Sequence, residues 1–113
     1  MAFIRKIVVV SLMLMIAAMT PSPSWAIPAA GQDLFNNHCS GCHVNGGNII
    51  RRGRTLKMAA LKRNGIDNPE AIARIAREGI GQMTGYTEAL GEGGDQIVAE
   101  WIWEQAQNAW TQG

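Results

Sequence analysis

The run Cys-Ser-Gly-Cys-His at residues 39–43 decides how this chain can fold. Cys39 and Cys42 are three positions apart, so on a helical turn both thiols lie on one face, and His43 follows directly. This spacing is the attachment motif of a c-type haem, whose two vinyl groups bond the two thiols. The imidazole of His43 would then bind the iron from the proximal side. We therefore expect one covalent haem c held by Cys39, Cys42 and His43.

Two other uses of a cysteine pair fit the sequence less well. A zinc site normally needs four clustered ligands, but there is no further cysteine, and the other histidine, His38, falls on the same turn. A thioredoxin-like dithiol would follow a strand in a βαβ unit, whereas the residues that flank this motif have a helical pattern. The motif therefore indicates haem attachment.

The first 26 residues have the pattern of an export signal. Arg5 and Lys6 give a short positive segment, residues 7–19 are apolar, and Ser-Trp-Ala at 24–26 resembles a cleavage site. The apolar stretch is shorter than the about 20 residues that a membrane span requires, although an uncleaved anchor is the alternative. We expect cleavage after residue 26, which would leave one small domain at residues 27–113.

Charge is balanced overall but unevenly distributed. Ten Lys and Arg against nine Asp and Glu give a net charge of +1, which does not suggest a nucleic-acid partner. Six basic residues gather between positions 51 and 63, while residues 78–113 carry acids and neither Lys nor Arg. The basic cluster is either a docking surface for a charged partner or a merely solvated face.

Glycine, asparagine and proline divide the rest of the chain into helical segments. We expect helices at about residues 29–41, 55–64, 67–79 and 95–110, and no sheet. The glycine-rich stretch at 79–94 should be a loop, and Gly31 and Phe35 should cross Val98 and Trp101. The predicted fold is all-α, with about four short helices around one haem.

The second axial ligand must come from outside the motif. Met58 falls in a predicted helix among charged residues, whereas Met83 falls in the glycine-rich stretch, which can wrap the opposite face of the haem. His38 is on the same side of the ring as the motif. We therefore expect Met83 to be the ligand. Coordination by His and Met closes both axial positions, which predicts one-electron transfer rather than an enzyme with a small-molecule substrate.

The chain resembles cytochrome c6, a class I cytochrome c, at residues 34–43, 46–50 and 55–57. Further matches follow in order at residues 61–65 and 70–72, at 79 with 83, and at 105–106 with 110. The resemblance implies a monomeric carrier of the thylakoid lumen or bacterial periplasm. Its electrons would pass from the cytochrome bf complex to photosystem I or a terminal cytochrome oxidase. The resemblance also places Asn48 beside the haem.

Three positions depart from the pattern of that family. Thr84 follows the ligand Met where the family usually has Pro, and Tyr86 replaces the usual Phe. Ile75 stands where typical members have a haem-facing Gln, and loss of that polar neighbour predicts a lower reduction potential and a less certain role as photosystem I donor. Thr84 also leaves open an alternative function, a haem-based sensor or ligand-binding protein with a labile Met ligand.

Overall fold

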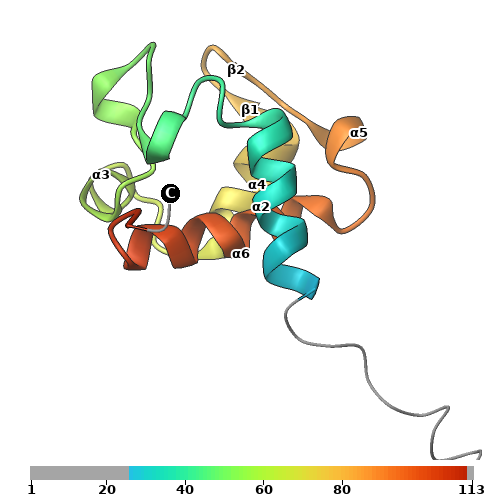
Figure 1. Cartoon of the computed structure of the whole chain (residues 1–113). Helices are drawn as coiled ribbons and strands as arrows, with labels where there is room; N and C mark the ends of the chain where they lie inside the picture. Colours follow the sequence, from blue (N-terminus) through green and yellow to red (C-terminus); the bar gives the residue numbers. More distant parts are fainter. Residues whose placement is uncertain (1–25, 112–113) are drawn as a thin grey trace, which may run out of the picture.

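The computed structural model describes residues 26–111, so the predicted export signal lies outside the described residues but for Ala26. Figure 1 shows how its helices are arranged. The elements are α2 (Ala26–His38), η1 (Val44–Gly46), η2 (Arg52–Arg54), α3 (Met58–Arg63), α4 (Pro69–Glu78), β1 (Gly79–Ile80), β2 (Met83–Thr84), α5 (Thr87–Leu90) and α6 (Gly94–Gln107). The predicted all-α class is confirmed.

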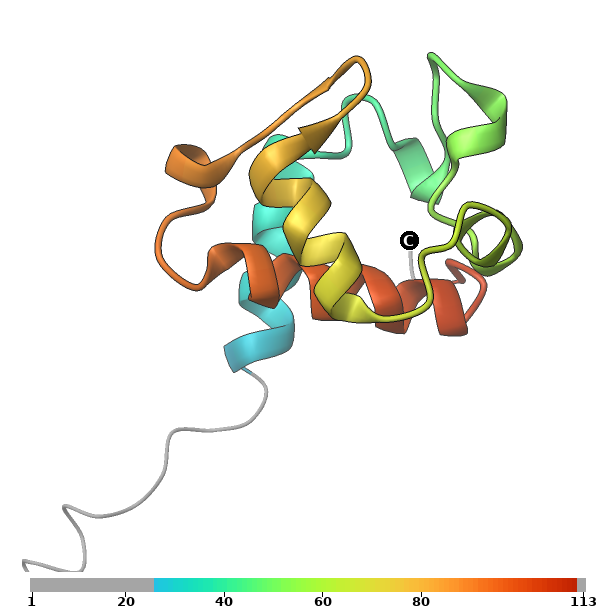
Figure 2. The same cartoon turned by 180° about the vertical axis from the view of Figure 1, so that it is seen from behind.

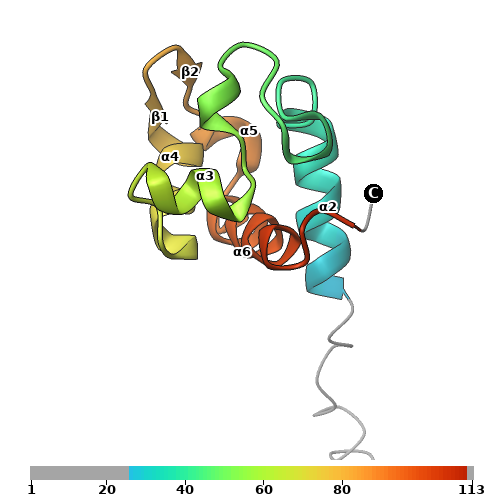
Figure 3. The same ribbon diagram turned by 90° about the vertical axis from the view of Figure 1, so that its left-hand side faces the viewer.

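Helices α2 and α6 cross in close contact, as predicted (Figures 1 and 3). A Cβ atom on Gly31 would lie 2.6 Å from Cβ of Trp101, so only glycine allows the two backbones to approach this closely. The Phe35 and Trp101 rings pack beside this crossing, with centroids 5.0 Å apart. The crossing fixes α2, whose last turn leads directly into the Cys-Ser-Gly-Cys-His motif.

Helix α4 packs on the other side of α6 and completes the core (Figure 2). Asn68 caps its first turn, because its side-chain oxygen accepts from the Ala71 amide at 2.8 Å, and Pro69 occupies the first helical position. The buried core joins three helices through Phe35 of α2, Ile72, Ala73 and Ala76 of α4, and Val98, Ala99 and Ile102 of α6. No helix among residues 26–111 has the length and hydrophobicity of a membrane span.

The expectation of no sheet is wrong. Residues 79–84 form a two-stranded antiparallel pair, with Gly79 opposite Thr84 and Ile80 opposite Met83. Positive φ angles of 80° at Gly79 and 56° at Gly81 allow the chain to reverse within this short distance. Two-residue strands are too short to show the alternation by which a strand is recognised in sequence.

The other predicted helix bounds shift by a few residues. The second helix begins at Met58 rather than near Thr55, and α6 ends at Gln107, because Ala109 and Trp110 have positive φ angles of 54° and 57°. The Trp110 ring then turns back, and its Nε1–H donates to the Leu56 carbonyl oxygen at 3.1 Å. This contact ties the segment after the motif to the C-terminal helix.

Candidate haem site

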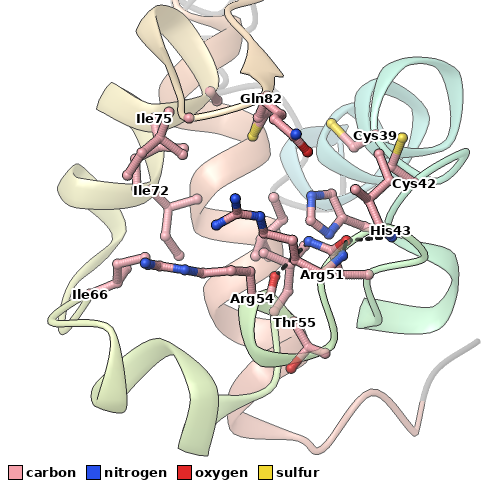
Figure 4. A pocket seen from close by; sticks show the side chains of 18 of the residues that line it. Cys39, Cys42, His43, Arg51, Arg54, Thr55, Ile66, Ile72, Ile75 and Gln82 are labelled. Carbon is pink, nitrogen blue, oxygen red and sulfur yellow. Dashed lines mark hydrogen bonds between the residues drawn. The ribbon is translucent and has the colours of Figure 1, made fainter.

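One cavity of about 380 Å³ lies between the motif, helix α4 and the β1–β2 segment (Figure 4). All six of the residues that the sequence placed at the haem line it, namely Cys39, Cys42, His43, Asn48, Ile75 and Met83. These residues come from segments far apart in the chain. The cavity is therefore the candidate haem site.

The motif continues the last turn of α2. The Cys39 amide donates to the Phe35 carbonyl oxygen at 2.8 Å, and the His43 amide donates to the Cys39 carbonyl oxygen at 3.0 Å. These helical hydrogen bonds keep the two cysteines on one side of the chain, as their spacing predicts. Figure 4 shows both sulfur atoms beside the His43 ring at the same end of the cavity.

The His43 ring is held by one hydrogen bond. Its Nδ1 lies 2.8 Å from the Gly47 carbonyl oxygen, and since a carbonyl only accepts, Nδ1 carries the proton. The lone pair of the neutral ring is therefore on Nε2, the nitrogen that remains for a metal. A metal-binding histidine is usually supported by such a hydrogen bond from its other ring nitrogen, because the bond fixes both the tautomer and the ring orientation.

The environment of Cys39 disfavours the thiolate form that a metal–thiolate site would need. Burial raises the pKa of the Cys39 thiol to about 11, so this thiol stays neutral at physiological pH. Among residues 26–111, no group of three or more His, Cys, Asp or Glu side chains is placed to hold a metal ion.

Residues 79–86, here called the Met loop, carry Met83 to the cavity. Two hydrogen bonds tie the end of the loop to α4. The Tyr86 amide donates to the Ala76 carbonyl oxygen at 2.8 Å, and the hydroxyl of Thr87, the next residue, donates to the Arg77 carbonyl oxygen at 2.8 Å. Met58, in contrast, packs against the hydrophobic core and is not a lining residue. Of these two methionines, Met83 lines the cavity and Met58 does not.

Helix α4 and the segment before it supply an apolar wall. Ile66, Ile72 and Ile75 lie along one side of the cavity in Figure 4, and Ile80 lines it from the Met loop. Such a wall suits the hydrocarbon face of a porphyrin. Ile75 is thus on the cavity, where the resemblance placed a residue of the haem environment.

Residues 48–54, here called the arginine loop, form a polar rim. Asn48 lines the cavity, but its amide binds the loop itself, since its Oδ1 accepts from the Ile50 and Arg51 amides at 2.9 and 2.7 Å. Its Nδ2–H donates to the Arg54 carbonyl oxygen at 3.0 Å. Arg51 and Arg54 also line the cavity. Their sequence context did not indicate this, because a run of basic residues predicts only a charged surface.

Known proteins match most of this chain. The family model described as "Cytochrome C oxidase, cbb3-type, subunit III" matches residues 26–102. A "cytochrome c6-like" protein of Nostoc sp. is 40% identical over 105 residues, which are 93% of this chain and 95% of that protein. The chain belongs to the cytochrome c6 family.

Solved structures of cytochromes c6 support both the family and the fold. Cytochrome c6B of Synechococcus sp. WH8102 is 67% identical, with a TM-score of 0.74 over 81% of this chain and 100% of that chain. Oxidised cytochrome c6A of Arabidopsis thaliana is 35% identical, with a TM-score of 0.69 over 77% and 97% of the two chains. The chain therefore has the class I cytochrome c fold.

Membership of the cytochrome c6 family settles the cofactor class and the general activity. The protein carries one covalent haem c and is an electron carrier, not an enzyme. The cavity fits that group on its own evidence. It offers two thiols on one side of a helical turn, a histidine whose Nε2 is free, a thioether from a separate loop, and an apolar wall.

Proposed function

We propose that this member of the cytochrome c6 family is a soluble shuttle that carries single electrons from a cytochrome bf complex to photosystem I or a terminal oxidase. The observation that carries the proposal is that Cys39, Cys42, His43 and Met83 line one cavity. Cys39 and Cys42 would hold the haem by thioethers, with His43 and Met83 on the iron. A haem iron with both axial positions filled supplies one-electron transfer with no open site for a substrate.

The Met loop favours a carrier over a sensor with a labile ligand. Although Thr84 replaces a rigid proline, it belongs to β2, which pairs with β1, and the loop is tied to α4 on its far side. Gly85 is packed against the backbone of α4 so closely that a Cβ atom there would overlap the Arg77 carbonyl oxygen. The neighbours of Met83 are thus fixed by tertiary contacts, which supports a permanent ligand.

The compartment and the mature form follow from the same proposal. We infer that residues 1–26 are an export signal, and that residues 27–113 work as a monomer in the thylakoid lumen or the bacterial periplasm. The support is the signal pattern of the sequence and the relatives of the chain, which include a cyanobacterial protein and an Arabidopsis thaliana cytochrome c6 described as chloroplastic.

A docking face is proposed at the mouth of the cavity. Ile50 and Ile80 line the cavity and are 63% and 53% exposed, and Ile49 beside them is 69% exposed. The arginine loop continues this face with the exposed Arg51, Arg52 and Arg54. An apolar centre with a basic rim fits a partner of the opposite charge, which such a field would steer toward the haem edge.

The axial ligands can be tested on the haem-loaded protein by optical spectroscopy. We expect the ferric form to show the near-infrared band of a Met–iron bond. The band should be lost in Met83→Ala and kept in the matched control Met58→Ala, and the reduction potential of Met83→Ala should fall. A wild-type protein without the band would contradict the carrier proposal and support the sensor.

The partners require a kinetic test. We expect purified photosystem I to oxidise the reduced protein after a flash, with a rate constant that decreases as salt is added, because opposite charges attract across the docking face. Charge reversal at Arg52, as Arg52→Glu, should slow the reaction at low salt and have little effect at high salt. A rate that is independent of salt would contradict docking through the basic rim.

A further inference from the structure

The arginine loop directs two of its three arginines into the cavity. Arg51 and Arg54 line the cavity, while Arg52, between them, does not. In Figure 4 the side chains of Arg51 and Arg54 extend from the loop toward the isoleucine wall. Two guanidinium groups therefore reach the space that the haem requires, whereas Arg52 is outside the cavity lining.

Among the described residues, these two charges have no carboxylate partner. Within residues 26–111 the ion pairs are those of Arg77 with Glu78 and Asp95, and no Asp, Glu or Lys side chain lines the cavity. The other titratable groups that line it are His38, Cys39, Cys42, His43 and Tyr86. Both arginines are exposed to solvent, and two positive charges at the rim of an otherwise apolar cavity attract a ligand that carries negative charge.

The loop that presents the two arginines is fixed before any ligand arrives. Asn48 binds it by three hydrogen bonds, to the amides of Ile50 and Arg51 and to the Arg54 carbonyl oxygen. Asn64 of the α3 end adds a fourth, since its Nδ2–H donates to the Gly53 carbonyl oxygen at 3.0 Å. Because the backbone is held on both sides, little order has to be gained when the arginines bind.

We propose that Arg51 and Arg54 bind the propionate carboxylates of the haem and keep them ionised. Arginine suits this task, because its planar group matches a carboxylate and stays charged at every accessible pH. Their two positive charges also disfavour the ferric state, so they raise the reduction potential, in the opposite sense to Ile75. The inference requires the attached haem and is independent of which partners exchange electrons with it.

The experiment compares Arg51→Gln, Arg54→Gln and the double variant with Arg52→Gln, all haem-loaded. Arg52→Gln is the matched control, since it removes the same charge from the same loop outside the cavity. The readouts are the propionate pKa, from the NMR shifts of the propionate methylene groups, and the pH dependence of the reduction potential. In the double variant we expect the propionate pKa to rise by roughly 1 unit or more, and the potential to become pH-dependent in that range.

A second variant protects the test against misfolding. Asn48→Ala keeps both arginines but frees the loop, so we expect a smaller rise of the propionate pKa in the same direction. The Met–iron band reports whether each variant keeps its fold and its ligands. If Arg52→Gln raises the propionate pKa as much as Arg51→Gln or Arg54→Gln, the effect is general charge and the inference is wrong. A propionate pKa that is unchanged in every variant would also overturn the inference, whatever happens to the electron-transfer rates.

Discussion

The Met loop and the arginine loop line the same cavity, but they are held in place by different means. The Met loop is held by backbone pairing and by glycines packed where no side chain fits, at Gly79 and Gly85. The arginine loop is held by the side-chain amides of Asn48 and Asn64, and its own Gly53 has open space around it. A loop that delivers an iron ligand is thus built with less freedom than one that delivers two long, charged side chains.

The largest expected effect comes from adding one methyl group to the Met loop. Gly79 has φ 80°, and a Cβ atom there would overlap the Met83 carbonyl oxygen and lie 2.7 Å from the Gly85 amide nitrogen. We expect Gly79→Ala to lower the free energy of unfolding by on the order of 2–4 kcal/mol, from backbone strain and overlap together. Denaturant unfolding followed by the Met–iron band measures both stability and ligation.

Gly53→Ala is the matched control in the arginine loop. Nothing lies within 4 Å of the added Cβ atom, and the φ angle of Gly53 is not positive. We therefore expect the free energy of unfolding to change by less than about 0.5 kcal/mol. If the two alanine variants behave alike, the two loops are equally tolerant and the contrast between them does not hold.

The same contrast explains what the sequence could predict. The haem motif works through local spacing, so Cys39, Cys42 and His43 could be placed from sequence, and the Gly31 crossing of α2 and α6 was also correct. The β1–β2 pair was missed, because two-residue strands have no periodic pattern. Arg51 and Arg54 were missed as cavity residues for another reason. Only the folded path of the loop places these two arginines on the cavity and leaves Arg52 outside its lining.

An intermediate effect is expected at Ile75, on the apolar wall between the two loops. In Ile75→Gln the amide can point its N–H groups toward the haem or its axial ligand, which withdraws electron density from the iron and favours the ferrous state. We expect the reduction potential to rise by an amount equivalent to about 1 kcal/mol, or roughly 40 mV for one electron. A redox titration of the haem-loaded protein measures it.

Ile75→Leu controls for packing, because it keeps the volume and adds no polar group. Its potential should equal that of the wild-type protein. A rise in Ile75→Leu comparable to that in Ile75→Gln would show that shape rather than polarity sets the potential. It would also remove the reason to expect a lower potential here than in typical cytochromes c6.

The smallest effect is expected beneath the Met loop, where Arg77 of α4 binds Asp95 in the first turn of α6. Arg77 Nη1 lies 2.6 Å from Asp95 Oδ2, and this hydrogen bond, ahead of the other contributions, lowers the pKa of Asp95 below 3.8. The Arg77 side chain is 41% exposed, so solvent screens the pair, and we expect Asp95→Asn to cost about 0.5–1 kcal/mol at neutral pH.

The pH dependence of that cost tests its origin. Because the folded-state pKa is the lower one, the stabilisation is fully present above the unfolded-state value of 3.8 and is lost as the pH falls through the folded-state pKa. The stability difference between wild type and Asp95→Asn should therefore shrink in acid below that value.

A double-mutant cycle with Arg77→Gln separates the ion pair from the favourable charge of Asp95 at the start of α6. The Met–iron band should stay unchanged throughout, because Gly85 of the Met loop and the Thr87 hydroxyl directly after it meet the backbone carbonyl oxygen of Arg77 and not its side chain. A band that weakens in Asp95→Asn would mean that the loop depends on how α4 sits on α6, and not only on its own glycines.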